Sequence, residues 1–154
     1  MRKNKNKLNG FTLIELLVVI GIIGILTGAV IVSLNPSARI AQARDGVRKS
    51  DLHQIQSALE LYRSDKGEYP LKANFPACGS PLKNGATVYM AKIPCNPPTQ
   101  ASYTYQGVPN SAGTGNVSYS LTACLENVGD PDRDSPNIAP CTLPKYTSYT
   151  LQNP

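Results

Sequence analysis

The feature that most constrains this chain is an apolar run at residues 11–34, FTLIELLVVIGIIGILTGAVIVSL, in which Glu15 is the only charged residue. Such a run would extend about 36 Å as a helix, enough to cross a bilayer with some tilt. Basic residues that flank a membrane segment stay on the cytoplasmic side, so the run predicts a single-pass helix whose C-terminal side faces outward. The basic residues before the run are Arg2, Lys3, Lys5 and Lys7.

Three kinds of segment share this pattern, and its length and Glu15 help to separate them. A secretory signal peptide has an apolar core of about 7–15 residues followed by a small-residue cleavage site. This run is longer and carries a carboxylate near its start. A plain membrane anchor gives no reason for Glu15, because an ionisable residue inside a membrane segment is costly and marks a function. The third kind is a helix whose carboxylate has a cationic partner.

A cut after Gly10 would supply that partner. Phe11 would then carry a free α-amine, which is mostly protonated at neutral pH. Glu15 lies about one helical turn further along, and a carboxylate in a low-dielectric helix bundle needs a cation. The α-amine of a neighbouring subunit would provide that cation and would also set the axial register between adjacent helices.

The stretch KLNGFTLIELLVVIGIIGIL resembles the prepilin leader and N-terminal helix of type IV pilins and type II secretion pseudopilins. The matching features are the basic residues, Gly10 before the cut, Phe11 as the first mature residue and Glu15 as the fifth. The resemblance implies a prepilin peptidase that cleaves between Gly10 and Phe11 and methylates the Phe11 amine. It also implies an inner-membrane assembly platform and a homo-oligomeric filament of bundled N-terminal helices.

Residues 36–66 change to an amphipathic helical pattern. Apolar residues recur at three-, four- and seven-residue steps, with one five-residue step, which predicts a single apolar face. We expect that face to pack on the globular domain, and Gly67 and Pro70 to end the helix. Pro36 cannot lie inside a helix without a kink. The predicted face consists of Ile40, Val47, Leu52, Ile55, Leu59 and Tyr62.

From residue 67 onward the chain is rich in proline and tyrosine, and its prolines break any long helix. Short alternating runs predict strands at 87–93, 102–108, 117–125 and 146–151. The loop at 109–116 is rich in Gly, Ser and Asn and would join two of them as a hairpin. The predicted fold class is α+β: a pilin-like long N-terminal helix, with a transmembrane first half, packed on a small antiparallel sheet with disulfide-closed loops.

These patterns divide the chain into four segments. Residues 1–10 are a leader peptide, residues 11–35 the transmembrane and assembly helix, residues 36–66 the amphipathic half of that helix, and residues 67–154 the globular β domain. The strands and the long helix agree with the architecture that the pilin resemblance implies.

The four cysteines include no C-x-x-C pair, and His53 is the only histidine, so a zinc site is poorly supported. An even number of cysteines behind a membrane segment favours disulfides in an oxidising compartment. Three pairings are possible. We prefer Cys78–Cys95 and Cys124–Cys141, because each closes a similar short loop, worth about 3 kcal/mol in the chain-entropy model. The alternative is that one or both pairs stay reduced.

Three alternating carboxylates form the sequence D-P-D-R-D, a pattern that suits a hard cation such as Ca²⁺. The EF-hand template fails, because Ser135 stands where glycine is required and Cys141 stands at the twelfth position. Major pseudopilins bind calcium in a C-terminal loop, so the resemblance implies calcium as a possible cofactor. The alternative is a solvated acidic loop. The candidate ligands are Asp130, Asp132 and Asp134.

The formal charge of +5 does not indicate a nucleic-acid protein. From Phe11 onward, eleven Lys and Arg face ten Asp and Glu, so the excess reports the basic N-terminus. A local basic patch follows residue 38 but has no interleaved aromatic residues and no binding motif. We interpret it as a solvated face or an inter-subunit contact. Its members are Arg39, Arg44, Arg48 and Lys49.

The sequence therefore predicts a structural protein with no catalytic residues and no cofactor other than the candidate calcium. The chain would wait in the cytoplasmic membrane, N-terminus inside, and later stand at the cell surface or in the periplasm as part of a type IV pilus-like filament. A major pseudopilin of a type II secretion system is a close alternative, which the GEYP segment and the short domain favour. The cysteines and proline-rich loops favour a surface pilin. A membrane-anchored adhesin or binding module that does not assemble is an alternative of another class.

Overall fold

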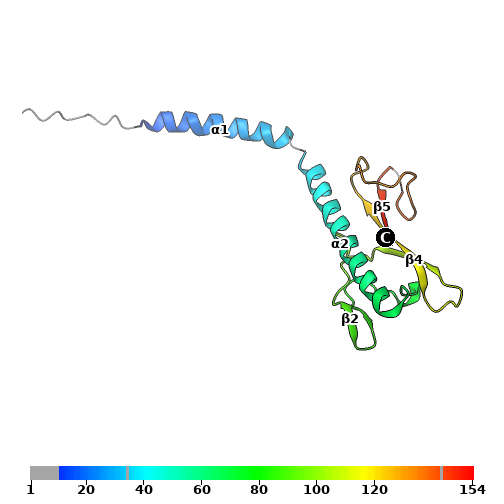
Figure 1. Cartoon of the computed structure of the whole chain (residues 1–154). Helices are drawn as coiled ribbons and strands as arrows, with labels where there is room; N and C mark the ends of the chain where they lie inside the picture. Colours follow the sequence, from blue (N-terminus) through cyan, green and yellow to red (C-terminus); the bar gives the residue numbers. More distant parts are fainter. Residues whose placement is uncertain (1–10, 34, 143) are drawn as a thin grey trace, which may run out of the picture. The chain divides into compact units, whose positions relative to one another are not determined.

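The computed structural model describes residues 11–33, 35–142 and 144–154. The predicted leader, and with it Gly10, lies outside these described residues. The chain divides into two compact units, one ending at Ser37 and the other spanning Ala38–Pro154. The helices and strands can be followed along the chain in Figure 1, where some of them are labelled. In chain order they are α1 (Leu13–Ser33), α2 (Pro36–Lys66), a short 3₁₀ helix η1 (Lys72–Asn74), β1 (Leu82–Asn84), β2 (Thr87–Met90), β3 (Thr104–Pro109), β4 (Asn116–Leu125) and β5 (Thr147–Gln152).

Helix α1 is the apolar helix that the sequence predicts. Its segment Leu13–Val30 is long and apolar enough, by length and composition, to cross a membrane. The large apolar side chains of this segment are exposed. A helix that is apolar on all sides belongs inside a protein bundle or a bilayer, so α1 requires an apolar environment that its own unit does not supply.

Two helices are present where the sequence pattern predicts two halves of one. Helix α1 ends at Ser33 and α2 begins at Pro36, and Asn35 between them has a φ of 43°. That φ lies in the left-handed region, where asparagine is among the few residues that are tolerated. A residue before proline is also disfavoured in the right-handed helical region, whereas proline itself suits a first helical turn.

The prediction that one apolar face of α2 packs on the domain is right for its C-terminal half. Leu52, Ile55 and Leu59 are fully buried there, in contact with the β domain. The prediction is wrong for Ile40 and Val47, whose side chains are 54% and 50% exposed.

Ile40 and Val47 are exposed because charged residues occupy the packed face in this part of α2. One and two turns before Leu52, that face carries Arg48 and Asp45, which are 3% and 1% exposed. A hydrophobic periodicity cannot reveal this, because a charged residue normally marks the solvent side of a helix.

The β domain contains a three-stranded antiparallel sheet with the order β3-β4-β5 and a separate β1-β2 hairpin. Strands β3 and β4 pair antiparallel, from Thr104 opposite Thr122 to Pro109 opposite Asn116, which confirms the predicted hairpin across residues 109–116. The predicted strand at 87–93 is shorter than expected and ends at Met90. Strand β1 was missed, because a three-residue L-K-N segment has no β-branched or aromatic signal.

Helix α2 and the three-stranded sheet can be located in Figure 1. The core between them is rich in tyrosine. Rings of Tyr69 and Tyr119 meet edge to face, with centroids 4.6 Å apart. The hydroxyl of Tyr69 donates to Glu60 at 2.8 Å, and that of Tyr105 donates to the main-chain oxygen of Pro70 at 2.7 Å. Buried tyrosines need such partners, so the core combines apolar packing with satisfied hydroxyl groups.

Two disulfides, Cys78–Cys95 and Cys124–Cys141, close loops of the β domain. They are the pairing that the sequence analysis prefers, and the described residues include no free cysteine. Cys124 lies on β4, the central strand of the sheet. The second bridge therefore ties the loop that follows β4 back to the middle of the sheet.

Candidate functional site

The predicted processing and assembly residues lie at the start of α1. Gly10 is outside the described residues, and Phe11 is exposed. The Thr12 main-chain N–H and hydroxyl both donate to Oε2 of Glu15, at 2.9 and 2.7 Å. In return, the Glu15 main-chain N–H donates to the Thr12 hydroxyl oxygen at 3.3 Å. Glu15 therefore has a partner inside its own chain, which the sequence reasoning overlooked.

This arrangement is a capping box, in which a Ser or Thr and a Glu or Gln three residues later satisfy each other's main-chain donors. The pattern T-x-x-E before an apolar run could have been recognised in the sequence. A capping box works with glutamine as well as glutamate. The cap explains why an oxygen-bearing side chain stands at position 15, but it does not require the negative charge.

A second exposed apolar stripe runs along α2. Ile40, Val47 and Leu61 are exposed and lie on one heptad register, with Gln54 at the intervening position. Heptad spacing of apolar residues is typical of a face that packs against another helix. Three residues after each of these positions stands a small side chain, which allows close approach: Ala43, Ser50, Ser57 and Ser64, all exposed.

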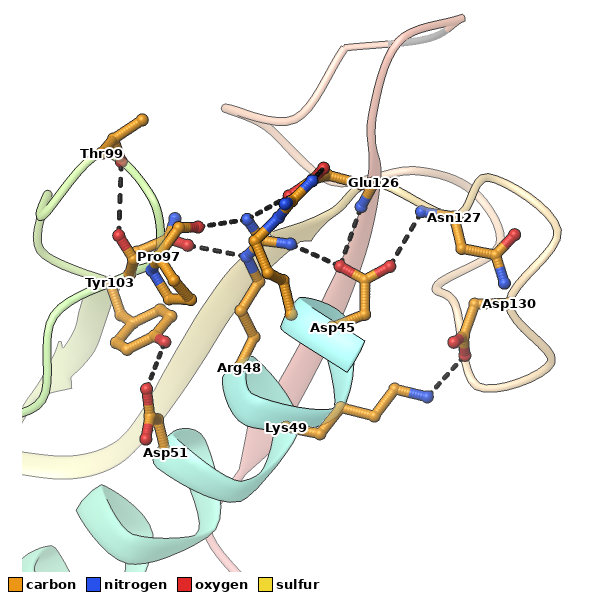
Figure 2. A network of polar contacts seen from close by, with 12 residues as sticks. Asp45, Arg48, Lys49, Asp51, Pro97, Thr99, Tyr103, Glu126, Asn127 and Asp130 are labelled. Carbon is orange, nitrogen blue, oxygen red and sulfur yellow. Dashed lines mark hydrogen bonds and ion pairs between the residues drawn. The ribbon is translucent and has the colours of Figure 1, made fainter. Parts of the chain in front are cut away.

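A network of ionic contacts joins the first half of α2 to two loops of the β domain (Figure 2). The Asp45 carboxylate accepts hydrogen bonds from the main-chain N–H groups of Glu126 at 2.9 Å and Asn127 at 2.8 Å. It also accepts from Nη1 of Arg48 at 2.5 Å. A nearly buried carboxylate is tolerated only with such partners, so Asp45 holds the chain where it leaves β4.

Arg48 links the same carboxylates to the loop at residues 94–99. Its Nε donates to Oδ1 of Asn96 at 2.7 Å, and Nη2 donates to the main-chain oxygen of Pro97 and to Glu126 at 2.6 Å. Arg44 also pairs with Glu126. Hydrogen bonds from Arg44, and then from Arg48, lower the pKa of the Glu126 carboxyl to about 2, although partial burial acts in the opposite direction. Glu126 is therefore ionised at any physiological pH.

Lys49 reaches the loop that follows β4. Its Nζ donates to Oδ1 of Asp130 at 2.6 Å and to Oδ2 of Asp132 at 2.7 Å. Oδ1 of Asp130 also accepts the main-chain N–H of Asp132 at 2.9 Å. The interpretation of the basic patch as a solvated or inter-subunit face is thus wrong for three of its members, because Arg44, Arg48 and Lys49 pair with carboxylates of their own chain.

The three aspartates of the candidate calcium site do not converge. Asp134 turns to β5, where it accepts hydrogen bonds from the Thr150 main-chain N–H at 3.2 Å and hydroxyl at 2.8 Å. Asp130 and Asp132 share the Lys49 ammonium instead. Among the described residues, no group of three His, Cys, Asp or Glu side chains could hold a metal ion. Calcium needs six to eight oxygen ligands at about 2.3–2.6 Å, and this arrangement does not fit it.

Comparisons with known proteins identify one family model and a group of similar proteins. The family model described as the prokaryotic N-terminal methylation motif matches residues 5–31. The chain is 31% identical over 102 residues to the type II secretion system core protein G of Escherichia coli, which covers 66% of this chain and 61% of that protein. It is 42% identical over 62 residues to the protein of the same name in Pseudomonas aeruginosa, 40% of this chain and 42% of that one.

The core protein G of Aeromonas hydrophila is 38% identical over 66 residues, 43% of this chain and 45% of that protein. The chain thus spans about half the length of the curated relatives it matches. No solved structure matches it significantly. The methylation motif, which contains Phe11 and Glu15, and the similarity to core protein G together support the type IV pilin and type II secretion pseudopilin family for this chain.

Proposed function

We propose that this chain is a structural subunit of a type IV pilus-like filament, and more specifically a pseudopilin of a type II secretion system. The observation that carries the proposal is a helix that is apolar on all sides, exposed, and interrupted by one carboxylate, within a methylation motif. The relatives named core protein G support the secretion form of the filament. The role is structural, and we propose no catalytic residue.

The proposal places the chain in the cytoplasmic membrane before assembly, with its basic N-terminus inside and Ala38–Pro154 outside. Prepilin peptidase would cut between Gly10 and Phe11 and methylate the Phe11 amine. An inner-membrane platform would then add the subunit to a homo-oligomeric filament. In that filament Glu15 would pair with the Phe11 amine of a neighbouring subunit, because a carboxylate among apolar helices needs a cation.

The exposed stripe on α2 supports assembly as well. Burial of Ile40, Val47 and Leu61 against helices of neighbouring subunits would remove apolar surface that the single chain leaves in water. A membrane-anchored module that works alone would have no use for a heptad face of this kind.

The capping box makes a sharp test of the Glu15 pair possible. Glu15→Gln keeps a side chain that can close the cap but removes the charge. We expect this variant to insert and to be processed normally, and to lose most filament assembly. The measurements are membrane fractionation, the mass of the mature chain and the amount of protein in purified filaments.

The matched control is Thr12→Ala, which removes the cap and keeps the charge. It should assemble close to normally. Normal filaments from Glu15→Gln would refute the charge pair, and an equal loss of filaments in Thr12→Ala would assign the effect to the cap. Replacing Gly10 by a bulky residue should leave the chain at precursor mass; a mature-size product would refute the cleavage site.

A surface pilus is the second candidate, which the two disulfides and the proline-rich loops favour. Immunogold electron microscopy of native cells, with an antibody against the C-terminal unit, separates the two. Label confined to the envelope is the expected result for a secretion pseudopilin. Label along long surface fibres would assign the chain to a surface pilus instead.

A further inference from the structure

The loop after β4 binds a side-chain cation of its own chain through two carboxylates. Asp130 and Asp132 are separated by one residue, and both accept a hydrogen bond from Nζ of Lys49 on α2. Figure 2 shows the Lys49 side chain extended toward Asp130. The Asp130 side chain is 11% exposed and that of Lys49 21% exposed, so this pair lies at the edge of the packed interior rather than free in solvent.

The ammonium is suited to this position. Partial burial lowers the pKa of Lys49, but the hydrogen bonds to Asp130 and Asp132 more than offset this, and the pKa lies above its ordinary value. Two carboxylates this close repel each other unless a cation stands between them. The ammonium supplies one positive charge and three donors. Lys49 therefore offsets the repulsion between the two carboxylates.

Neighbouring contacts hold the first half of the same loop at two further points. Asp45 binds the main-chain N–H groups of Glu126 and Asn127 at the start of the loop, and Asp134 binds Thr150 of β5 further along. Lys49 holds the segment between these two points. Every candidate calcium ligand of the loop therefore already has a protein partner among the described residues.

We propose that the Lys49 ammonium is the resident cation of this loop, and that the unit Ala38–Pro154 therefore folds to the same stability with and without calcium. In this respect the chain departs from the calcium-binding C-terminal loop that its pseudopilin resemblance implies. Lys49, rather than a calcium ion, links the acidic loop to α2. This inference concerns the folded unit and holds whether or not the chain assembles into filaments.

The test is thermal unfolding of the purified full chain in detergent, in millimolar calcium chloride and in a chelator. The unfolding midpoint should be the same in both conditions. Lys49→Met keeps the aliphatic stem but removes the charge, and it should lower the midpoint by roughly 5 °C. The control is Lys66→Met on the same helix. Among the described residues Lys66 pairs only with the exposed Asp65 next to it, at 3.4 Å, so this change should shift the midpoint little.

A double-mutant cycle separates the ion pair from packing. Lys49 also lies over the ring of Tyr149, with Nζ 5.3 Å from its centroid. In a chain that carries Asp130→Asn and Asp132→Asn, Lys49→Met should cost clearly less than in the unchanged chain. An equal cost in both would overturn the proposal in favour of the ring contact. A midpoint of the unchanged chain that rises with calcium, or a Lys49→Met variant as stable as Lys66→Met, would also overturn it.

Discussion

Helix α1 and the unit Ala38–Pro154 differ in where their side chains find partners. The apolar side chains of α1 are exposed, and its one carboxylate is engaged in a local cap with Thr12. In the second unit, Leu52, Ile55 and Leu59 are fully buried, and charges far apart in sequence pair with one another. Two disulfides add covalent links there.

The difference shows that the two parts depend on different surroundings. The second unit contains the partners that its buried groups need, so its stability is an intramolecular property. Helix α1 needs a bilayer or other helices to cover it. Substitutions in the second unit should therefore change its free energy of unfolding, whereas substitutions in α1 should act on insertion and assembly.

The largest effect is expected from Leu59→Ala. Leu59 is a residue of α2 and is fully buried where this helix packs on the sheet. Its truncation leaves a cavity and should cost about 3 kcal/mol in the free energy of unfolding. Leu61→Ala, two residues away on the exposed side, should cost less than about 0.5 kcal/mol. Denaturant unfolding followed by circular dichroism measures both.

Leu17→Ala is the matched substitution in α1, where the leucine side chain is exposed. It should leave the unfolding of the second unit unchanged and act only on assembly. Equal costs for Leu59→Ala and Leu17→Ala would show that the two parts are not energetically separate.

A smaller effect is expected at Gly107. A Cβ atom there would overlap the side chain of Asn116, which is buried and donates to the main-chain oxygen of Pro70 at 2.6 Å. Gly107→Ala should therefore cost about 2 kcal/mol in the free energy of unfolding, through the displaced side chain and its lost hydrogen bond.

Gly24 of α1 provides the contrast, because a Cβ atom there meets nothing within 4 Å in the single chain. Gly24→Ala should not change the unfolding of the second unit. If filament yield falls in this variant, Gly24 is a close packing point between subunits. An unchanged yield would mean that the glycine reflects ordinary membrane-helix composition.

The smallest effect is a pH dependence confined to the second unit. The pKa of Glu126 is lowered from 4.5 to about 2, first through its hydrogen bond with Arg44. The stabilisation is therefore fully present above pH 4.5 and is lost as the pH falls toward 2. Because the site is partly exposed, we expect it to contribute about 1–2 kcal/mol. In urea titrations between these pH values, the free energy of unfolding of Glu126→Gln should fall less steeply with decreasing pH than that of the unchanged chain. An equal fall in both chains would contradict the assignment.

Local patterns were enough to predict much of this molecule. The apolar run, the methylation motif with Phe11 and Glu15, the helical periodicity after Pro36 and the β3-β4 hairpin all depend on residues close together in sequence. Their physical causes are equally local: side-chain hydrophobicity, the missing N–H of proline and the turn preference of Gly and Asn. The preferred cysteine pairing also followed from sequence proximity.

The contacts of the charged residues could not be read in this way. The sequence shows Asp45, Arg48 and Lys49 as an ordinary polar helix surface. Only the packing of α2 against two distant loops buries Asp45 and Arg48 near Glu126 and brings Lys49 to Asp130. The same packing leaves Ile40 exposed. The tertiary fold determines which charges about eighty residues apart lie close enough to pair. Hydrophobic periodicity carries no information about that part of the fold.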